Sequence, residues 1–209
     1  CGAQPQWRRI VACHFHFIRA DKMRMALEHR HAVALVKAPP AGNLGVDHLI
    51  GNVKQRRFKG ILGINIGKNV DTPVERAVDD YLIGFAKAYP WADYITVNIS
   101  SPNTPGLRSL QFGDSLIALL KPLKECQTQL AQQTGRYVPL AVKIAPDMTD
   151  AEVRETARCL KNVGVDAIIA TNTTVGREVV QHCRHGGETG ADAGHPLFVA
   201  SAFVTWFRH

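Results

Sequence analysis

The sequence has 209 residues, of which 45% are hydrophobic, so the chain is long and apolar enough for one domain with a sizeable core. No run of 18 apolar residues occurs, and we therefore expect no membrane-spanning helix. Five scattered cysteines argue against a disulfide framework and fit a reducing compartment. The chain begins at Cys1 rather than Met, so we expect its natural start to be missing.

The formal net charge of +7 is concentrated near the start of the chain. Residues 1–59 carry 11 Lys and Arg against 3 Asp and Glu, whereas the rest of the chain carries 14 against 15. A basic arm of this kind could contact nucleic acid or an anionic membrane. We keep such a binding module as an alternative function and do not expect nucleic acid to be the partner.

Two terminal segments differ from the rest of the chain. Residues 1–41 contain four of the nine histidines and show no sustained strand or helix period. We expect this segment to be atypical and foreign to the fold, for instance the product of a shifted reading frame. Residues 198–209 form an atypical tail by the same reasoning.

A regular pattern begins near residue 60. Residues 60–67 are apolar and predict a strand, and a helix should follow. Thr72 is a good N-cap for that helix, and Glu75 would complete a capping box. The β-branched and aromatic residues 94–97 predict the next strand.

The second half of the pattern repeats the first. Leucines recur on one side of residues 114–134 and predict a helix that stops at Gly135. Residues 138–145 predict a strand, Thr149 and Glu152 form a second capping box, and residues 166–172 predict a fourth strand. Strict alternation of strand and helix indicates an α/β protein with a parallel sheet.

Polar side chains stand near the carboxyl ends of the four predicted strands: Asn65, Asn98, Lys143 and Asn172. In an open sheet these groups would spread over roughly 14 Å, at about 4.8 Å per strand. In a (β/α)8 TIM barrel the strand ends curve around a common centre, where active sites form. One ligand is reached more easily in a barrel, so we predict a (β/α)8 TIM barrel, incomplete because only its central strands and helices are visible.

The loop from Asn98 to Arg108 carries the most informative chemistry. Its carboxamides and hydroxyls follow a buried strand directly, and Pro102 and Pro105 keep it from becoming helical. Such groups suit a small, flat, heteroatom-rich ligand. A second polar cluster, His182, Cys183 and His185, is better explained as solvated surface than as a metal site, and we expect no metal.

Together these stretches resemble the quinone-linked (class 2) dihydroorotate dehydrogenases. The similarity runs from about Gly42 to Leu197, so the resemblance makes residues 42–197 a partial FMN-binding TIM barrel. It rests on the ordered set GNLGVD (42–47), GINIGKN (63–69), NISSPNTPGLR (98–108), AVKIAPD (141–147) and ATNTT (170–174).

The resemblance implies roles for particular residues. Ser101 matches the catalytic base, and serine rather than cysteine at this position favours the quinone-linked class. FMN-contacting residues of the family match Asn65, Asn98, Lys143, Thr171 and Gly194. Residues that hold the pyrimidine ring and its carboxylate match Asn98, Asn103, Asn172 and Thr173.

The implied function is the flavin-dependent oxidation of (S)-dihydroorotate to orotate, with a membrane quinone as acceptor, in de novo pyrimidine (UMP) biosynthesis. A related FMN barrel acting on another pyrimidine is the alternative enzyme. The resemblance places the full-length parent peripherally on the cytoplasmic face of the bacterial inner membrane, held by an amino-terminal region that is missing here. The family's later phosphate-binding glycine loops have no counterpart either, so we expect this chain to be inactive by itself.

Overall fold

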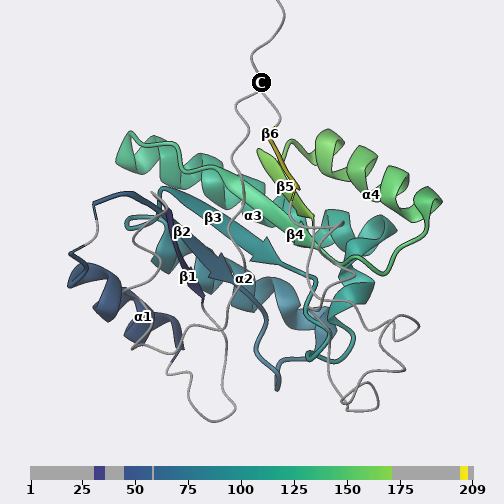
Figure 1. Ribbon diagram of the computed structural model, residues 1–209, viewed down its shortest axis with the longest axis horizontal. Helices are drawn as coiled ribbons and strands as arrows, with labels where there is room; N and C mark the ends of the chain where they lie inside the picture. The colour runs from purple at the N-terminus through teal and green to yellow at the C-terminus, as the bar shows by residue number, and fades with distance from the viewer. Residues whose placement is uncertain (1–30, 36–44, 58, 171–202, 207–209) are drawn as a thin grey trace, which may run out of the picture.

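The computed structural model describes residues 31–35, 45–57, 59–170 and 203–206 (Figure 1). Six strands form one sheet in the order of the chain: β1 (His31–Leu35), β2 (Ile61–Ile66), β3 (Tyr94–Asn98), β4 (Leu140–Ile144), β5 (Ala167–Ala170) and β6 (Phe203–Trp206). Strands β1 to β5 pair in parallel, and β6 pairs antiparallel with β5. The predicted parallel α/β architecture is confirmed for β1 to β5.

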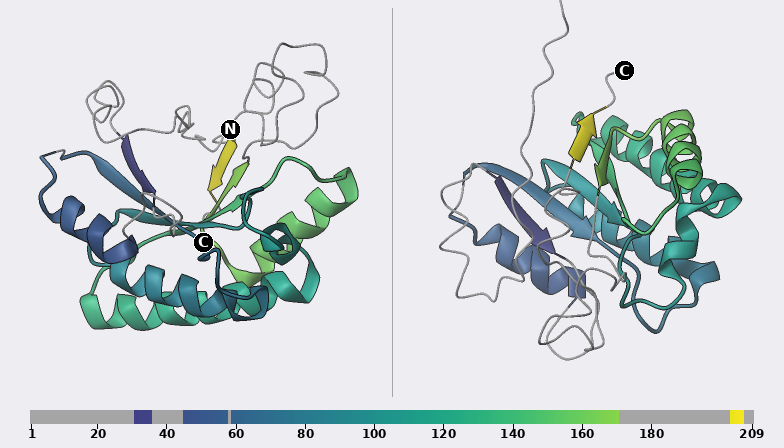
Figure 2. Two further views of the ribbon diagram at one scale, coloured as in Figure 1. Left: turned by 90° about the horizontal axis from the view of Figure 1, so that it is seen from below. Right: turned by 45° about the vertical axis from the view of Figure 1, so that its right-hand side comes forward.

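A helix follows each of the first four strands: α1 (Gly45–Lys54), α2 (Ala77–Ala88), α3 (Gly113–Thr134) and α4 (Asp150–Val163). Two short 3-10 helices, η3 (Val74–Arg76) and η4 (Leu107–Gln111), precede α2 and α3. Figure 2 shows the four α-helices together on the convex face of a curved sheet. Sequential parallel strands with every crossover on one face form an arc of a (β/α)8 barrel, in which the concave face is the interior.

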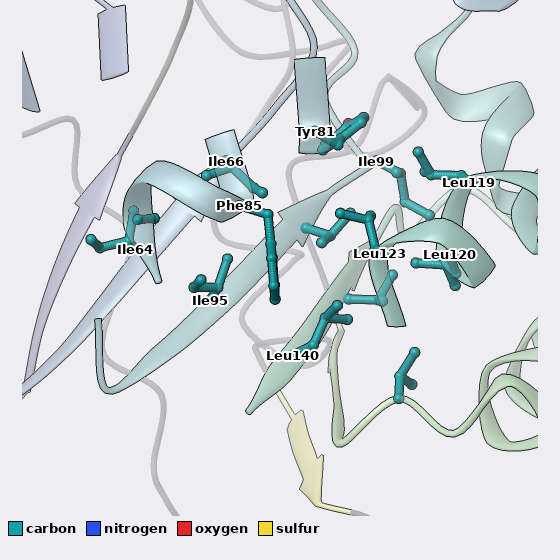
Figure 3. Packing of buried hydrophobic residues seen from close by; sticks show 14 of the residues in the cluster. Ile64, Ile66, Tyr81, Phe85, Ile95, Ile99, Leu119, Leu120, Leu123 and Leu140 are labelled. Carbon is teal, nitrogen blue, oxygen red and sulfur yellow. The ribbon is translucent and has the colours of Figure 1, made fainter. Parts of the chain in front are cut away.

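The main core lies between the sheet and the helices (Figure 3). Alternate strand residues point toward the helices, and they meet aromatic and leucine side chains of α2 and α3. The largest fully buried members are Ile64, Ile66, Tyr81, Phe85, Tyr89, Ile95, Ile99, Leu107, Leu116, Leu120, Leu123 and Leu140. Apolar burial at this scale stabilises the arc and holds its strands in register.

Two aspartates close the amino ends of neighbouring strands in the same way. Asp93, just before β3, donates its N–H to the Leu62 carbonyl and accepts the Leu62 N–H on its carboxylate at 2.7 Å. Asp166, just before β5, makes the same pair of bonds with Leu140, the carboxylate distance being 2.8 Å. This end of the sheet is therefore built for stability, which is typical of the amino-terminal face of a barrel.

The two predicted capping boxes have different outcomes. At α4 the prediction is confirmed, because Thr149 and Glu152 each bond the other's backbone N–H. At α2 the prediction is wrong: the chain enters through η3, and Pro73 caps it without a side-chain bond. The loop before η3 is organised by tertiary contacts instead, since Lys68 donates to the carbonyls of Asn69 and Thr72.

Residues 1–41 show no sustained strand period, yet His31–Leu35 within them forms strand β1. This segment pairs in parallel with β2, with Leu35 opposite Asn65. A strand of a parallel sheet needs no two-residue alternation, so a short apolar run escapes a periodicity test. Strand β6 lies within the expected tail, at the β5 edge, where backbone groups otherwise lack a partner.

Candidate active site

Successive strand residues point to opposite faces, so the residues between the core positions face the concave side of the sheet. These residues are Gly63, Asn65, Tyr94, Thr96, Asn98, Ala141, Lys143, Ala167 and Ile169. Three of them form a small apolar cluster of their own, separate from the helix-side core: Ala141, Ala167 and Ile169. The polar members lie toward the carboxyl ends of the strands, where barrel enzymes hold their ligands.

The strand register defines two levels on this face. Asn98 and Lys143 are direct partners on β3 and β4, and strands lie about 4.8 Å apart. Asn65 is paired with Thr96, two residues before Asn98, which is about 6.6 Å lower along the strands. The structure therefore brings the three described members of the predicted FMN set onto one face of adjacent strands.

Asn65 has a buried acceptor without a partner. Its side chain is 2% exposed, and no described group donates to its Oδ1 atom. A buried carbonyl oxygen left unpaired costs on the order of 1–3 kcal/mol. A ligand that brings an N–H group to this oxygen would remove that cost.

Asn98 has a defined orientation. Its Oδ1 atom accepts both the backbone N–H of Ser100, at 3.1 Å, and the Ser100 hydroxyl, at 2.6 Å. Because a backbone N–H requires an acceptor, the oxygen must face Ser100, and the amide NH2 group is directed elsewhere. Asn98 therefore offers two N–H donors to a ligand.

Lys143 is the charged residue among the concave-face residues named above. Its side chain is only 4% exposed, which is rare for lysine. Lys143 lies in an otherwise apolar strand. The strand register places Asn98 of β3 and Ile169 of β5 beside it at the same level. A buried ammonium group here places positive charge beside the amide of Asn98.

The predicted base, Ser101, lies at the start of the loop that follows β3. It is 9% exposed, and its Oγ atom accepts a long hydrogen bond, 3.4 Å, from the backbone N–H of Asn103. The hydroxyl proton of Ser101 is therefore available as a donor. Asn103 itself is exposed on the rim of the loop.

Three residues that sequence reasoning missed brace the loops of this site. Buried Tyr81 donates its hydroxyl to the Asn98 carbonyl at 2.6 Å and accepts the Lys68 backbone N–H; burial raises its pKa above the ordinary value of 10.0. Gln111 accepts the N–H of Ala145 at 2.6 Å, and Arg108 pairs with Asp147 at 2.5 Å. Each brace joins the carboxyl ends of neighbouring strands, and nothing local in the sequence indicates the partner of Tyr81, Gln111 or Arg108.

The remaining predicted site residues, Thr171, Asn172, Thr173 and Gly194, lie outside the described part of the chain, as do His182, Cys183 and His185. Among described residues, no group of three or more His, Cys, Asp or Glu side chains could hold a metal ion. No helix in the same part of the chain is long and apolar enough to cross a membrane.

Comparison with known proteins agrees with this geometry. The family model described as dihydroorotate dehydrogenase matches residues 32–197, which include all of β1 except His31. A relative from Azotobacter vinelandii named dihydroorotate dehydrogenase (quinone) is 61% identical over 166 residues, which cover 79% of this chain and 48% of the relative. A Pseudomonas putida protein of the same name is 59% identical over 173 residues, which cover 83% of this chain and 51% of that relative.

Solved structures show the same fold. A ligand-free dihydroorotate dehydrogenase from Eimeria tenella is 32% identical, with a TM-score of 0.71, and the match covers 82% of this chain and 58% of that one. A second structure of the Eimeria tenella enzyme, in complex with ferulenol, has a TM-score of 0.68 at 33% identity and covers 77% and 48%. The chain spans about half the length of the curated relatives it matches. The sheet is thus an incomplete (β/α)8 barrel, and the chain belongs to the dihydroorotate dehydrogenase family.

Proposed function

We propose that this chain supplies half of the active site of an enzyme that oxidises (S)-dihydroorotate to orotate and passes the electrons to a membrane quinone, in de novo pyrimidine (UMP) biosynthesis. The observation that carries the proposal is the grouping of Asn65, Asn98 and Lys143 on the concave face, with Ser101 in the loop that directly follows β3. The names of the relatives support both the substrate and the acceptor.

The described residues fit a flavin, on which this family generally depends. The pyrimidine edge of a flavin presents one N–H donor between two carbonyl acceptors. The site offers a complementary set: the unpartnered acceptor Oδ1 of Asn65, the amide donors of Asn98 and the ammonium group of Lys143. We assign these residues, with Thr171 and Gly194, to binding FMN.

The substrate would be held by amide and hydroxyl groups of the same loops, namely Asn98, Asn103, Asn172 and Thr173. Carboxamides can pair with both the N–H and the C=O groups of the ring without adding charge. The proton on the ring carbon next to the carbon that loses hydride goes to Ser101, whose weak basicity requires a water relay. FMN, when bound, accepts the hydride and delivers the electrons to the quinone.

The quinone suggests where the whole protein works. We propose that it is peripheral on the cytoplasmic face of the bacterial inner membrane, where a lipid-soluble quinone is accessible. The contact with the membrane would be made by an amino-terminal region outside the matched half.

The proposal is tested in a full-length enzyme, referred to below as the test enzyme. In it, residues 32–197 of this chain replace the matching stretch of the Azotobacter vinelandii relative. Ser101→Ala should retain FMN but slow flavin reduction by dihydroorotate about 10²–10⁴-fold, the usual contribution of general-base catalysis. The loss should shrink as pH rises, because solvent base partly replaces the hydroxyl.

Stopped-flow absorbance of the bound flavin measures this step directly. A Ser101→Ala enzyme that is reduced at the parent's rate would remove Ser101 from the mechanism. An unsubstituted test enzyme that binds FMN but does not oxidise dihydroorotate would refute the proposed function.

A further inference from the structure

Arg108 connects the loop of the proposed base to the next strand of the barrel. Its Nε atom donates to the Ser100 carbonyl at 3.1 Å, and its NH1 atom pairs with the Asp147 carboxylate at 2.5 Å. Ser100 belongs to the loop after β3, and Asp147 belongs to the loop between β4 and α4. Both charged side chains are sheltered, 21% and 27% exposed, so solvent screens this pair less than it screens the surface pairs of the helices.

The bond to Ser100 controls the direction in which Ser101 leaves the sheet. Ser100 is fully buried, and Asn98 Oδ1 already holds both its N–H and its hydroxyl. Arg108 holds its carbonyl, which is the remaining polar group. Because the Ser100–Ser101 peptide is planar, the direction of this carbonyl also sets the direction of the Ser101 N–H and Cα.

The other side of Ser101 is restricted by its neighbour. Pro102 biases Ser101 toward extended backbone conformations, which limits ψ of Ser101. With the preceding peptide held by Arg108 and the following torsion limited by Pro102, the Cα–Cβ bond of Ser101 has little freedom. Its hydroxyl can then be reproducibly placed against a substrate.

We infer that Arg108 is a positioning residue for the oxidation of dihydroorotate, acting on the base through the Ser100 carbonyl. The inference rests on the proposed role of Ser101. Asp147 orients the guanidinium and ties it to the β4 strand, which also carries Lys143. The loop that carries the base and the strand that carries the buried ammonium are therefore joined by the side chain of Arg108.

An arginine is needed for this task. The guanidinium has several N–H donors in a rigid plane and can serve a carbonyl and a carboxylate at the same time. A lysine would keep the charge, but its compact ammonium cannot hold two acceptors in the same fixed geometry. The two variants Arg108→Ala and Arg108→Lys therefore separate loss of charge from loss of the planar bridge.

The test follows the two half-reactions of the test enzyme separately by stopped-flow. Arg108→Ala should slow flavin reduction by dihydroorotate about 10- to 100-fold, because a displacement of about 1 Å costs on the order of 10²-fold. Arg108→Lys should give an intermediate loss, and added guanidinium should restore part of the rate lost in Arg108→Ala. Reoxidation by quinone should remain within about twofold of the parent, because proton abstraction by Ser101 plays no part in it.

Two further measurements distinguish positioning from general damage to the loop. The affinity for orotate, read from the visible spectrum of the bound flavin, should change less than about threefold, because Arg108 acts through the Ser100 backbone. The pH profile of Arg108→Ala should keep the parent's shape, unlike that of Ser101→Ala, because the base is still present. The matched control is Arg158→Ala, which removes an exposed ion pair with Glu155 on α4 and should leave every rate unchanged.

Each outcome decides the question. Parent-like flavin reduction in Arg108→Ala overturns the inference and leaves the proposed function standing. Equal losses in both half-reactions, without rescue by guanidinium, assign Arg108 to stability alone and also overturn it. Failure of the unsubstituted test enzyme to oxidise dihydroorotate refutes the proposed function itself.

Discussion

Two buried tyrosines, Tyr81 within α2 and Tyr89 at the C-cap of the same helix, provide a matched test of how the proposed site is held. Tyr81 and Tyr89 are both fully buried, and each hydroxyl donates to one backbone carbonyl and accepts one backbone N–H. Tyr81 bridges Lys68 and Asn98 at the carboxyl ends of the strands. Tyr89 bridges Arg136 and Val138 at the amino ends. Replacing each with phenylalanine removes one oxygen and keeps the ring.

The stability loss follows from the groups left behind. Tyr81→Phe leaves the Asn98 carbonyl and the Lys68 N–H without their partner, and each unsatisfied buried group costs about 1–3 kcal/mol. Asn98 is half-buried, so water recovers part of this, and we expect a loss of about 1–3 kcal/mol in total. Tyr89→Phe should cost about the same, because Val138 is fully buried. At a urea m value of ~3 kcal/mol/M, a loss of 2 kcal/mol lowers the unfolding midpoint by roughly 0.7 M.

The two variants should differ at the ligand site. Of the two tyrosines, Tyr81 is the one that bonds the backbone of Asn98, so Tyr81→Phe should weaken FMN binding about 3- to 10-fold, whereas Tyr89→Phe should not. In the test enzyme, urea unfolding followed by circular dichroism measures the loss of stability. Flavin fluorescence on release measures the change in FMN affinity. Equal FMN affinity in the two variants would refute the link between Tyr81 and the site, and an unchanged midpoint in both would refute the hydrogen-bond reasoning.

Two further predictions concern stability. Two hydrogen bonds from Thr149 lower the pKa of Glu152 below its ordinary value of 4.5. The bond from the backbone N–H has the larger effect, and the bond from the hydroxyl adds to it. The ionised Glu152 carboxylate therefore stabilises the fold above about pH 4.5, and this stabilisation is lost as pH falls through the lower pKa of the folded state. Glu152→Gln should be less stable than the parent near neutral pH and equally stable in acid. Urea unfolding midpoints at the two pH values would show this. A Cβ atom on Gly63 would overlap the ring of Tyr94 on the neighbouring strand, so Gly63→Ala should cost about 1–3 kcal/mol. In a Tyr94→Ala background, Gly63→Ala should cost less than it costs in the parent. If the double variant lost the sum of the two single losses, the Tyr94 ring would not be the obstacle.

Local patterns in the sequence were enough to predict most of the elements. Strands β2 to β5, helices α3 and α4, the Thr149 capping box and the stop at Gly135 each depend on neighbouring residues, so they are legible in a short window. The loop from Asn98 to Arg108 was legible for the same reason, because its prolines and its position after a strand are local features. The ordered motifs then pointed to the family that the comparisons show.

Other features were decided only by tertiary structure, because they depend on residues far apart in the chain. Strand β1 exists through its pairing with β2, and the entry to α2 is shaped by loop contacts rather than by Thr72. The braces of the site join residues 17, 34 and 39 positions apart: Tyr81 to Asn98, Gln111 to Ala145, and Arg108 to Asp147. Their places near strand ends and the family resemblance made Asn65, Asn98 and Lys143 candidates, but the register of three parallel strands determined that they share one face and lie on adjacent levels.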